Sequence, residues 1–394
     1  MKVAKDGGVS TNEQTVVKLE SPAIRTSKRR TITRLGFVSL VDAAPFFVAQ
    51  DNGFFAKYGL NVTLSREVGW ATIREKILYG ELEAAHSICP MPMAATLGMN
   101  SIAMPCVTGM ILNRGGNAII LSEDLWKRGV RDGKSLHQDI TNRRHFRKYI
   151  FATVFPCSTH AFILRDWFKS VGIDPDIDIQ MVTLPPSQMC RNLAAGTIDG
   201  FCAGDPWTSL AIAQETGWSP ACSVDICPDH PEKALMVKES FAEDHNEEHL
   251  AVIAALYEAC AYCDDTANHE SIARSMASRN RVNCDYSLIM KCLSSQFDYG
   301  MGRVERKPGY LVFNRFDANR PTQEQADWVA KRISSCGPDL NEQQLDSLKR
   351  RVFREDLYDE AIGRIDSSII SKFPPNPIKD EHTKTINRYD HSCG

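Results

Sequence analysis

The chain has 394 residues, and its 46 Lys and Arg nearly balance its 49 Asp and Glu, so the formal net charge is -3. This balance argues against nucleic acid or an acidic membrane surface as the main partner. The apolar content of 43% is ordinary for a globular protein, and no run approaches the ~18–20 apolar residues of a membrane span. Because the chain is too long for one ordinary core, we expect a soluble protein of two lobes or domains.

The 13 cysteines are odd in number and lack the spacing of a disulfide-rich domain. Many stand inside apolar runs, such as Cys89, Cys106 and Cys202, where a free thiol behaves as a small hydrophobic group. This usage favours a reducing cytoplasm over an oxidising compartment.

The N-terminal stretch, residues 1–32, is polar and mixed in charge, without the continuous apolar core that a signal peptide needs. Arg29-Arg30 before an apolar run has a superficial likeness to a twin-arginine export signal. Asp42 soon interrupts that run, which fits a first core strand better. We therefore predict a disordered tail at 1–32, a flexible tail at 376–394, and a cytoplasmic protein that is not exported.

From residue 33 onward, short apolar strands alternate with amphipathic helices. Strands are predicted at 34–38, 60–64 and 84–88, and helices at 43–51, 71–78 and 92–97. Such alternation indicates a parallel sheet with helices on both faces. Ligands of these sheets lie beyond the carboxyl ends of the strands.

A second alternating block follows a predicted strand at 117–121 and a polar, basic stretch at 127–147 that indicates a boundary. Its strands are predicted at 149–154 and 179–183, its helices at 159–170 and 187–195, and a return strand at 234–237. The remaining helices are predicted at 248–263, 286–296, 322–334 and 343–351. Two blocks joined by two crossings predict an α/β protein with mostly parallel sheets and a hinge cleft. Lobe 1 would comprise 33–121 and 234–375, and lobe 2 would comprise 122–233.

The stretch from Phe201 to Lys233 contains the most suggestive local pattern. A short apolar strand runs through Gly204 into a helix, for which Asp205 is a plausible N-cap and Pro206 a plausible first residue. A strand that feeds a helix N-terminus through a glycine can present backbone N–H groups to a small anion, and Lys233 follows after a proline turn. The plain alternative is an ordinary strand–helix unit followed by a surface loop.

Three further residues could converge on such a cleft: Trp70, Asn117 and His160. Each also has an ordinary structural explanation, as core packing, a turn residue and a neighbour of a helix cap. Together with Gly204 and Lys233 they supply hydrogen-bond donors. The sequence shows no recognisable nucleophile–base arrangement, P-loop or dinucleotide fingerprint. This pattern favours holding an oxyanion over reacting with it, so we predict a binding protein and not an enzyme.

Several short motifs of the sequence carry a family resemblance. It runs from about residue 34 to about residue 361 and is carried by several short motifs in order: Asp42-Ala43-Ala44-Pro45, Gly53-Phe54-Phe55, Gly69-Trp70-Ala71-Thr72, Ala85-His86-Ser87-Ile88-Cys89-Pro90-Met91-Pro92, Gly116-Asn117-Ala118, Phe155-Pro156-Cys157-Ser158-Thr159-His160, Gly204-Asp205-Pro206-Trp207 and Asp229-His230-Pro231-Glu232-Lys233. The chain resembles the nitrate/bicarbonate-binding (NrtA/CmpA) family of periplasmic-type binding proteins, and within it the cytoplasmic NasS-type nitrate/nitrite sensors.

The resemblance implies a type II periplasmic-binding-protein-like α/β fold and a ligand site between the lobes. By motif, the ligand-binding residues fall on Trp70, Asn117, His160, Gly204 and Lys233. The transport proteins of the family carry Gln where Asn117 stands, so a direct contact of this shorter amide with the ligand is open. They often carry Glu where Asp205 stands, and we do not expect this carboxylate to touch an anion. The resemblance implies no cofactor and no metal.

The resemblance also implies a role. As a cytoplasmic sensor, the protein would bind nitrate or nitrite and thereby release a NasT-type antitermination regulator, controlling nitrate assimilation genes without touching nucleic acid or membrane itself. The alternative is an exported substrate-binding component of a nitrate or bicarbonate ABC transporter. A third possibility, an enzyme resembling the thiamine-pyrimidine synthases, lacks the Cys-Cys-Cys-Phe-Cys cluster of that group. The sequence leaves nitrate, nitrite and bicarbonate open.

Overall fold

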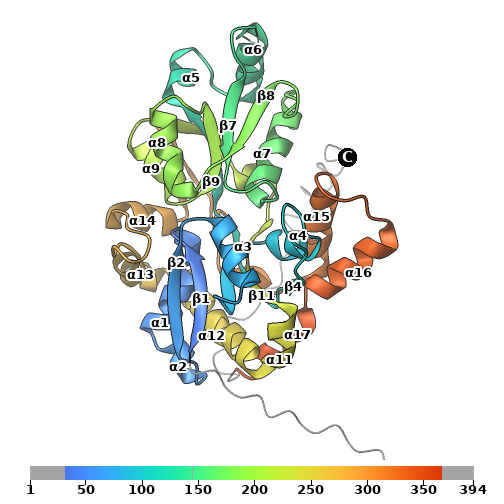
Figure 1. Ribbon diagram of the computed structural model, residues 1–394. Coiled ribbons are helices and arrows are strands. Elements are labelled where there is room, and N and C mark those ends of the chain that lie inside the picture. The colour runs from blue at the N-terminus through green and yellow to red at the C-terminus, as the bar shows by residue number, and fades with distance from the viewer. Residues whose placement is uncertain (1–31, 144, 366–394) are drawn as a thin grey trace, which may run out of the picture.

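The computed structural model describes residues 32–143 and 145–365, and these form two lobes stacked end to end (Figure 1). The predicted tails lie outside the described residues, apart from residue 32, as does the end of the predicted lobe 1 beyond residue 365. Within the described residues, no helix is long and apolar enough to cross a membrane.

The first lobe is built on a seven-stranded sheet of order β14-β5-β11-β3-β1-β2, with β4 paired to β11. Its strands are β1 (Thr33–Val38), β2 (Val62–Glu67), β3 (Ala84–Ile88), β4 (Cys106–Val107), β5 (Ile111–Gly115), β11 (Pro231–Lys238) and β14 (Leu311–Val312). Its helices are α1 (Ala44–Asp51), α2 (Phe54–Lys57), α3 (Trp70–Leu78), α4 (Met91–Thr96), α11 (Glu239–Asp244), α12 (Asn246–Asp264), α13 (His269–Met276) and α14 (Tyr286–Leu293).

The second lobe is built on a five-stranded sheet of order β10-β6-β9-β7-β8. Its strands are β6 (Asn117–Ser122), β7 (Tyr149–Thr153), β8 (Ile179–Thr183), β9 (Gly200–Gly204) and β10 (Gly217–Cys222). Its helices are α5 (Glu123–Lys127), α6 (Gly133–Arg143), α7 (Thr159–Ser170), α8 (Met189–Ala194), α9 (Trp207–Ala213) and α10 (Ser223–Ile226). A hairpin of β12 (Gln296–Gly300) and β13 (Arg303–Arg306) forms a separate two-stranded sheet, whose Phe297 and Tyr299 pack with Ala118 and Cys222 of the second lobe.

The sheets are mixed, which corrects the prediction that they are mostly parallel. β1 runs parallel to β2 and β3, and β7 runs parallel to β8 and β9. Beyond these strands the pairing is antiparallel, because β11 and β6 enter their sheets from the opposite lobe. Each sheet therefore has a parallel half and an antiparallel half that contains a crossing strand.

The lobe boundaries also differ from the prediction. The strand at 117–121 was placed in lobe 1, but β6 pairs with β9 and β10 in the second sheet. The crossing falls at Gly115 and Gly116, which both have positive φ, and a Cβ on Gly115 would lie 2.2 Å from the Tyr310 carbonyl oxygen. Only glycine fits such a position without strain. The return crossing precedes Pro231, because β11 already pairs in the first sheet there.

The basic stretch at 127–147 is not a boundary but part of the second lobe. It contains the whole of α6, whose Leu136 and Ile140 are buried in the same apolar cluster as Tyr149 and Phe168. The Lys and Arg residues of α6, Lys134 and Arg143, are exposed, as expected for the outer face of an amphipathic helix.

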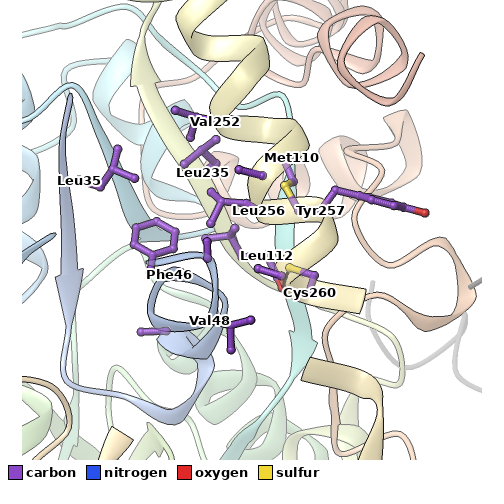
Figure 2. Close-up of a cluster of buried hydrophobic side chains, with 14 of the residues drawn as sticks. Leu35, Phe46, Val48, Met110, Leu112, Leu235, Val252, Leu256, Tyr257 and Cys260 are labelled. Carbon is purple, nitrogen blue, oxygen red and sulfur yellow. Dashed lines mark hydrogen bonds between the residues drawn. The ribbon is translucent and has the colours of Figure 1, made fainter. Parts of the chain in front are cut away.

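The core of the first lobe lies between its sheet and α12 (Figure 2). α12 is buried over most of its length, and Leu256 packs in one cluster with Leu35, Phe46 and Leu235 from the sheet and α1. Burying a side chain of this kind stabilises the fold by about 1.5–3 kcal/mol. This core fixes β1, β3 and β11 relative to one another.

A C-terminal arm of three helices, α15 (Gln323–Ser334), α16 (Glu342–Val352) and α17 (Glu355–Ile362), completes the described chain. It is fastened to the first lobe by backbone hydrogen bonds between Thr108 and the segment around Phe353. α15 also reaches the second lobe, where Arg332 pairs with Asp166 at 2.9 Å. The arm therefore contacts both lobes.

Candidate functional site

The five residues predicted to bind the ligand come together where the two sheets meet. Trp70 begins α3, Asn117 begins β6, His160 is the second residue of α7, Gly204 ends β9 and Lys233 lies in β11. All five are buried, and Asn117, His160 and Lys233 have no exposed surface. Their convergence agrees with the sequence prediction, while their role in binding remains a prediction.

Lys233 lies in the interior and not in a surface loop. Its Nζ is 2.7 Å from Asp42 Oδ2 and 2.6 Å from Glu232 Oε1. Adjacent residues of a regular strand point to opposite faces, but the ladder between β11 and β5 shifts register on both sides of Lys233. This irregularity allows Glu232 and Lys233 to reach the same interior space.

Glu232 is the hub of the arrangement. Its Oε2 accepts a 2.5 Å hydrogen bond from Asn117 Nδ2, and its Oε1 lies 3.4 Å from His160 Nε2. Burial raises the pKa of Glu232, but Lys233 and the neighbouring imidazoles outweigh burial and lower it to about 2. Asn117 therefore has two possible roles. Its amide nitrogen donates a hydrogen bond that positions the Glu232 carboxylate, and its side chain also faces the site.

Asp42, Trp70 and His86 form the first-lobe side of the site. His86 Nε2 lies 2.9 Å from Asp42 Oδ1, and the rings of Trp70 and His86 are 5.5 Å apart. Lys233 Nζ lies 5.5 Å from the centre of the Trp70 ring, a distance at which an ammonium is attracted to an aromatic face. We use "buried polar cluster" for Asp42, Trp70, His86, Asn117, His160, Glu232 and Lys233.

Gly204 closes the cluster from the second lobe. It pairs with Asn117 across β9 and β6, and a Cβ on Gly204 would lie 3.3 Å from Asn117 Oδ1 and 3.6 Å from Asp42 Oδ2. A side chain at this position would therefore press directly on the polar groups. The glycine keeps the backbone close to them.

Asp205 serves the fold and not the cluster. Its Oδ1 accepts a 3.1 Å hydrogen bond from the Ser209 backbone N–H, and its Oδ2 accepts a 2.8 Å bond from the Tyr310 hydroxyl. The predicted N-cap position is one residue early, since α9 begins at Trp207 after Pro206. The carboxylate nevertheless satisfies a free N–H of the first helical turn.

The charges of the cluster are not those of a simple cationic anion site. Burial lowers the pKa of Lys233, but Asp42 and Glu232 outweigh burial and raise it, so the lysine stays charged. Both carboxylates have lowered pKa values and stay ionised. Burial also lowers the pKa of His160 to about 4, so its ring is neutral near pH 7. Two carboxylates and one ammonium leave one net negative charge in the interior.

Several buried polar atoms of the cluster lack a hydrogen-bond partner among the described residues: Trp70 Nε1, His86 Nδ1, Asn117 Oδ1 and His160 Nδ1. Most buried polar groups in proteins are hydrogen-bonded, so a group of orphans in one place is unusual. The indole can only donate, and an imidazole can donate or accept. The cluster thus retains donors that a small ligand could use.

A cavity of about 290 Å³ lies between the lobes at the carboxyl ends of β1 and β2, separate from the five predicted residues. Ser39 and Arg66 line it from the first lobe, and Ser187 and Trp207 line it from the second. Trp207 Nε1 donates a 3.1 Å hydrogen bond to the Ser39 carbonyl across the junction. The lobes are therefore in direct contact beside the cluster.

Sequence reasoning missed three residues of the cluster as site residues: Asp42, His86 and Glu232. Each stands within a motif that carried the family resemblance. A charged residue inside an otherwise apolar run, such as Glu232 and Lys233 before Ala234-Leu235-Met236-Val237, signals a buried ion pair. That signal was available, but the partner Asp42 lies far away in sequence.

A family model described as the NMT1-like family matches residues 27–277. The chain belongs to the NMT1-like family. Among curated relatives of this NMT1-like chain, the nitrate import ATP-binding protein NrtC of Synechocystis sp. is 36% identical over 332 residues, covering 83% of the chain and 49% of that protein. The chain thus spans about half the length of the first curated relatives that it matches.

The bicarbonate-binding protein CmpA of Synechococcus sp. is 30% identical over 352 residues, covering 84% of the chain and 78% of that protein. The crystal structure of the periplasmic nitrate-binding protein NrtA from Synechocystis PCC 6803 superposes with a TM-score of 0.81 at 25% identity, covering 86% of this chain and 91% of that chain. The predicted NrtA/CmpA family and the periplasmic-binding-protein-like fold class are both confirmed.

Proposed function

We propose that the chain binds a small planar oxyanion, nitrate or nitrite, in the buried polar cluster between its lobes. The observation that carries this proposal is the convergence of Trp70, Asn117, His160, Gly204 and Lys233, with unpaired donors at Trp70 and His160. Relatives named for nitrate and bicarbonate support the ligand class. The proposal concerns binding and not catalysis.

The charge balance makes the proposal more specific. An anion would add a second net negative charge to a cluster that already contains Asp42 and Glu232. Water cannot screen charges in the interior, so this addition is costly. Uptake of a proton offsets the added charge. The cluster has two buried imidazoles beside carboxylates, His86 at 2.9 Å from Asp42 and His160 at 3.4 Å from Glu232. We assign the proton to His160 because it is also one of the five predicted ligand-binding residues. We therefore propose that the anion and a proton bind together.

Bicarbonate is a second candidate, and one observation favours it. This anion carries a proton that must be donated, and the cluster contains two carboxylates, Asp42 and Glu232, that can accept it. Nitrate has only acceptor oxygens, so it would use the donors of the cluster and avoid these carboxylates. Bicarbonate would therefore donate a hydrogen bond to a carboxylate such as Glu232, whereas nitrate would be repelled by it.

Isothermal titration calorimetry against nitrate, nitrite and bicarbonate tests the proposal. Three or four hydrogen bonds to a charged group, each contributing ~1.5–3 kcal/mol before desolvation costs, are enough for micromolar binding. Nitrate or nitrite binding with bicarbonate silent supports the first candidate, and the reverse supports the second. Silence with all three anions contradicts the site.

Two biological roles are compatible with anion binding by this chain. The relatives support the binding component of an ABC importer, since one is named as an import ATP-binding protein and another as a periplasmic binding protein. The second candidate is a cytoplasmic NasS-type sensor that binds a NasT-type antitermination regulator and releases it when nitrate or nitrite arrives. The cysteine usage of the sequence, odd in number and often inside apolar runs, favours a reducing compartment and hence the sensor.

Two measurements separate these uses. Cell fractionation with an antibody against the chain locates it in the cytoplasm or outside it. Size-exclusion chromatography of the purified chain with a NasT-type regulator, with and without nitrate, then tests the sensor directly. A complex that dissociates on addition of nitrate supports the sensor, whereas an exported chain that forms no such complex supports the importer.

A further inference from the structure

Cys157 and Cys336 come from distant parts of the sequence, yet their sulfur atoms lie 3.8 Å apart. Cys157 is buried and directly precedes Ser158, the N-cap residue of α7. Cys336 is exposed and follows the end of α15. The two thiols are in contact, and solvent reaches one of them.

The surroundings of Cys336 favour reaction at this thiol. The hydrogen bond with Cys157 lowers the pKa of Cys336, burial raises it, Arg165 lowers it further, and the net effect is a lowered pKa. Conversely, the pKa of Cys157 is raised, first by Cys336 and then by burial. The thiolate is the reactive form of cysteine, so an exposed thiol with a lowered pKa, in contact with a second thiol, has the arrangement of a redox-sensitive pair.

These two thiols stand at a junction between separate parts of the molecule. The start of α7 belongs to the second lobe, and α15 belongs to the arm that is fastened to the first lobe through Thr108. Phe162 of α7 and Trp328 of α15 are in edge contact, with ring centres 6.3 Å apart. A covalent bond between the thiols would add a permanent link to these reversible contacts.

We propose that Cys157 and Cys336 form a reversible disulfide that fastens the start of α7 to the end of α15 and opposes separation of the lobes. His160 lies three residues after Cys157 and has no exposed surface. The start of α7 is therefore one wall of the buried polar cluster, and a molecule that enters or leaves on this side requires its movement. Oxidation slows that movement, and reduction restores it.

The chemistry needs an oxidant, for which we name a hydroperoxide. The Cys336 thiolate attacks one peroxide oxygen, the O–O bond breaks, and the hydroxide that leaves takes up a proton, which gives a sulfenic acid on Cys336. The Cys157 sulfur then attacks the Cys336 sulfur, the S–O bond breaks, and water leaves with the thiol proton. With hydrogen peroxide, two thiols yield one disulfide and two waters. The sulfur atoms must move from 3.8 Å to about 2 Å apart, which rotation of the exposed Cys336 side chain assists.

The test uses the full chain treated with hydrogen peroxide, then blocked with an alkylating agent and mapped by mass spectrometry. We expect a Cys157–Cys336 linked peptide pair, with a mass about 2 Da below that of the two reduced peptides, and its loss on treatment with dithiothreitol. Cys336→Ser should abolish the linked pair. Cys284→Ser, at another partly exposed cysteine, is the matched control and should leave the pair unchanged.

Hydrogen–deuterium exchange tests the mechanical part without any ligand. Peptides from the start of α7 should exchange more slowly in the oxidised wild type than in the reduced wild type, by about tenfold or more, because a cross-link restricts opening. Peroxide should produce no such slowing in Cys336→Ser. Failure to form the bond, or a bond from Cys336 to any other cysteine, overturns the pairing. A disulfide that leaves exchange at α7 unchanged overturns its role as a lock.

Discussion

Two regions of this protein are equally buried but are held together by different forces. The core under α12 consists of apolar side chains such as Leu35, Phe46 and Leu256. The buried polar cluster holds two carboxylates and an ammonium in a space where Lys233 and Glu232 have no exposed surface. The core gains its stability from the removal of apolar surface from water. The charged groups of the cluster lose their hydration free energy on burial, and only their ion pairs and hydrogen bonds with one another compensate for that loss.

This contrast shows that burial alone does not tell what a residue contributes. Apolar residues of similar volume in place of a buried ion pair are often neutral or stabilising for a protein. The core contributes the rigidity that holds β1, β3 and β11 in place. The cluster costs part of that stability and concentrates charge and unpaired donors at one point, which is the arrangement that a binding site needs.

The largest effect should come from Lys233→Met. This change leaves Asp42 and Glu232 as uncompensated buried carboxylates, so we expect the free energy of unfolding to fall by about 3–5 kcal/mol. Chemical denaturation monitored by circular dichroism measures it. Lys238→Met, in the same strand but partly exposed, is the matched control and should change the stability by less than about 1 kcal/mol. Equal effects of the two changes would contradict the ion-pair role of Lys233.

Leu256→Ala tests the other region, the apolar core under α12. Removing a large side chain from the core under α12 leaves a cavity, and we expect a loss of about 2–5 kcal/mol in the free energy of unfolding. The loss should be the same at pH 7 and pH 5, because no titrating group is involved. Anion affinity at 10 °C should stay that of the wild type, and a marked loss there would show that the core contributes directly to binding.

Each region contains a buried histidine whose pKa is lowered to the same extent, His160 in the cluster and His249 in the core, so acid sharpens the comparison. Burial lowers the pKa of both His160 and His249 from 6.5 to about 4. Between pH 6.5 and 4, these two histidines bind a proton in the unfolded chain but stay neutral in the folded chain. The free energy of unfolding therefore has its full value above pH 6.5. It falls as the pH drops from 6.5 to 4, by up to about 1.4 kcal/mol per pH unit for each histidine.

Urea denaturation between pH 7 and 4 measures this loss. We expect His160→Gln and His249→Gln each to remove a similar part of it. Saturating nitrate should reduce the part that belongs to His160, because the anion favours the protonated ring, and should leave the part that belongs to His249. An acid profile in which nitrate has no selective effect would contradict coupled binding of the anion and a proton.

The smallest effect on stability, but a clear one on binding, is expected for Trp70→Phe. The indole N–H of Trp70 has no hydrogen-bond partner among the described residues, so its removal should change the free energy of unfolding by less than about 1 kcal/mol. If the anion accepts this N–H, affinity should fall by about tenfold or more. Trp218→Phe removes a second buried and unpartnered indole N–H, in the second lobe, and should leave affinity unchanged in the same titration.

Local sequence pattern was sufficient for most of the regular elements. The predicted strand at 84–88, helix at 159–170 and strand at 179–183 agree with β3, α7 and β8 residue for residue. These segments have a clear apolar period and a clear stop signal at each end. The strands β4 and β14, of two residues each, are too short to show a period. In the hairpin of β12 and β13, Phe297 and Tyr299 are buried in alternation with exposed residues, but the alternation spans only five residues. None of these strands was predicted.

The sequence by itself determined the α/β class, the two lobes and, through its motifs, the five residues that meet between them. Only the tertiary structure decided that β6 belongs to the second lobe, that the sheets are half antiparallel, and that Lys233 is paired with Asp42 and Glu232. Periodicity records which face of a segment is apolar, and so it predicts elements. It does not record which distant segment a charged side chain meets. The net charge of the site depends on which distant residues, such as Asp42 and Lys233, are brought together, and only the fold decides this.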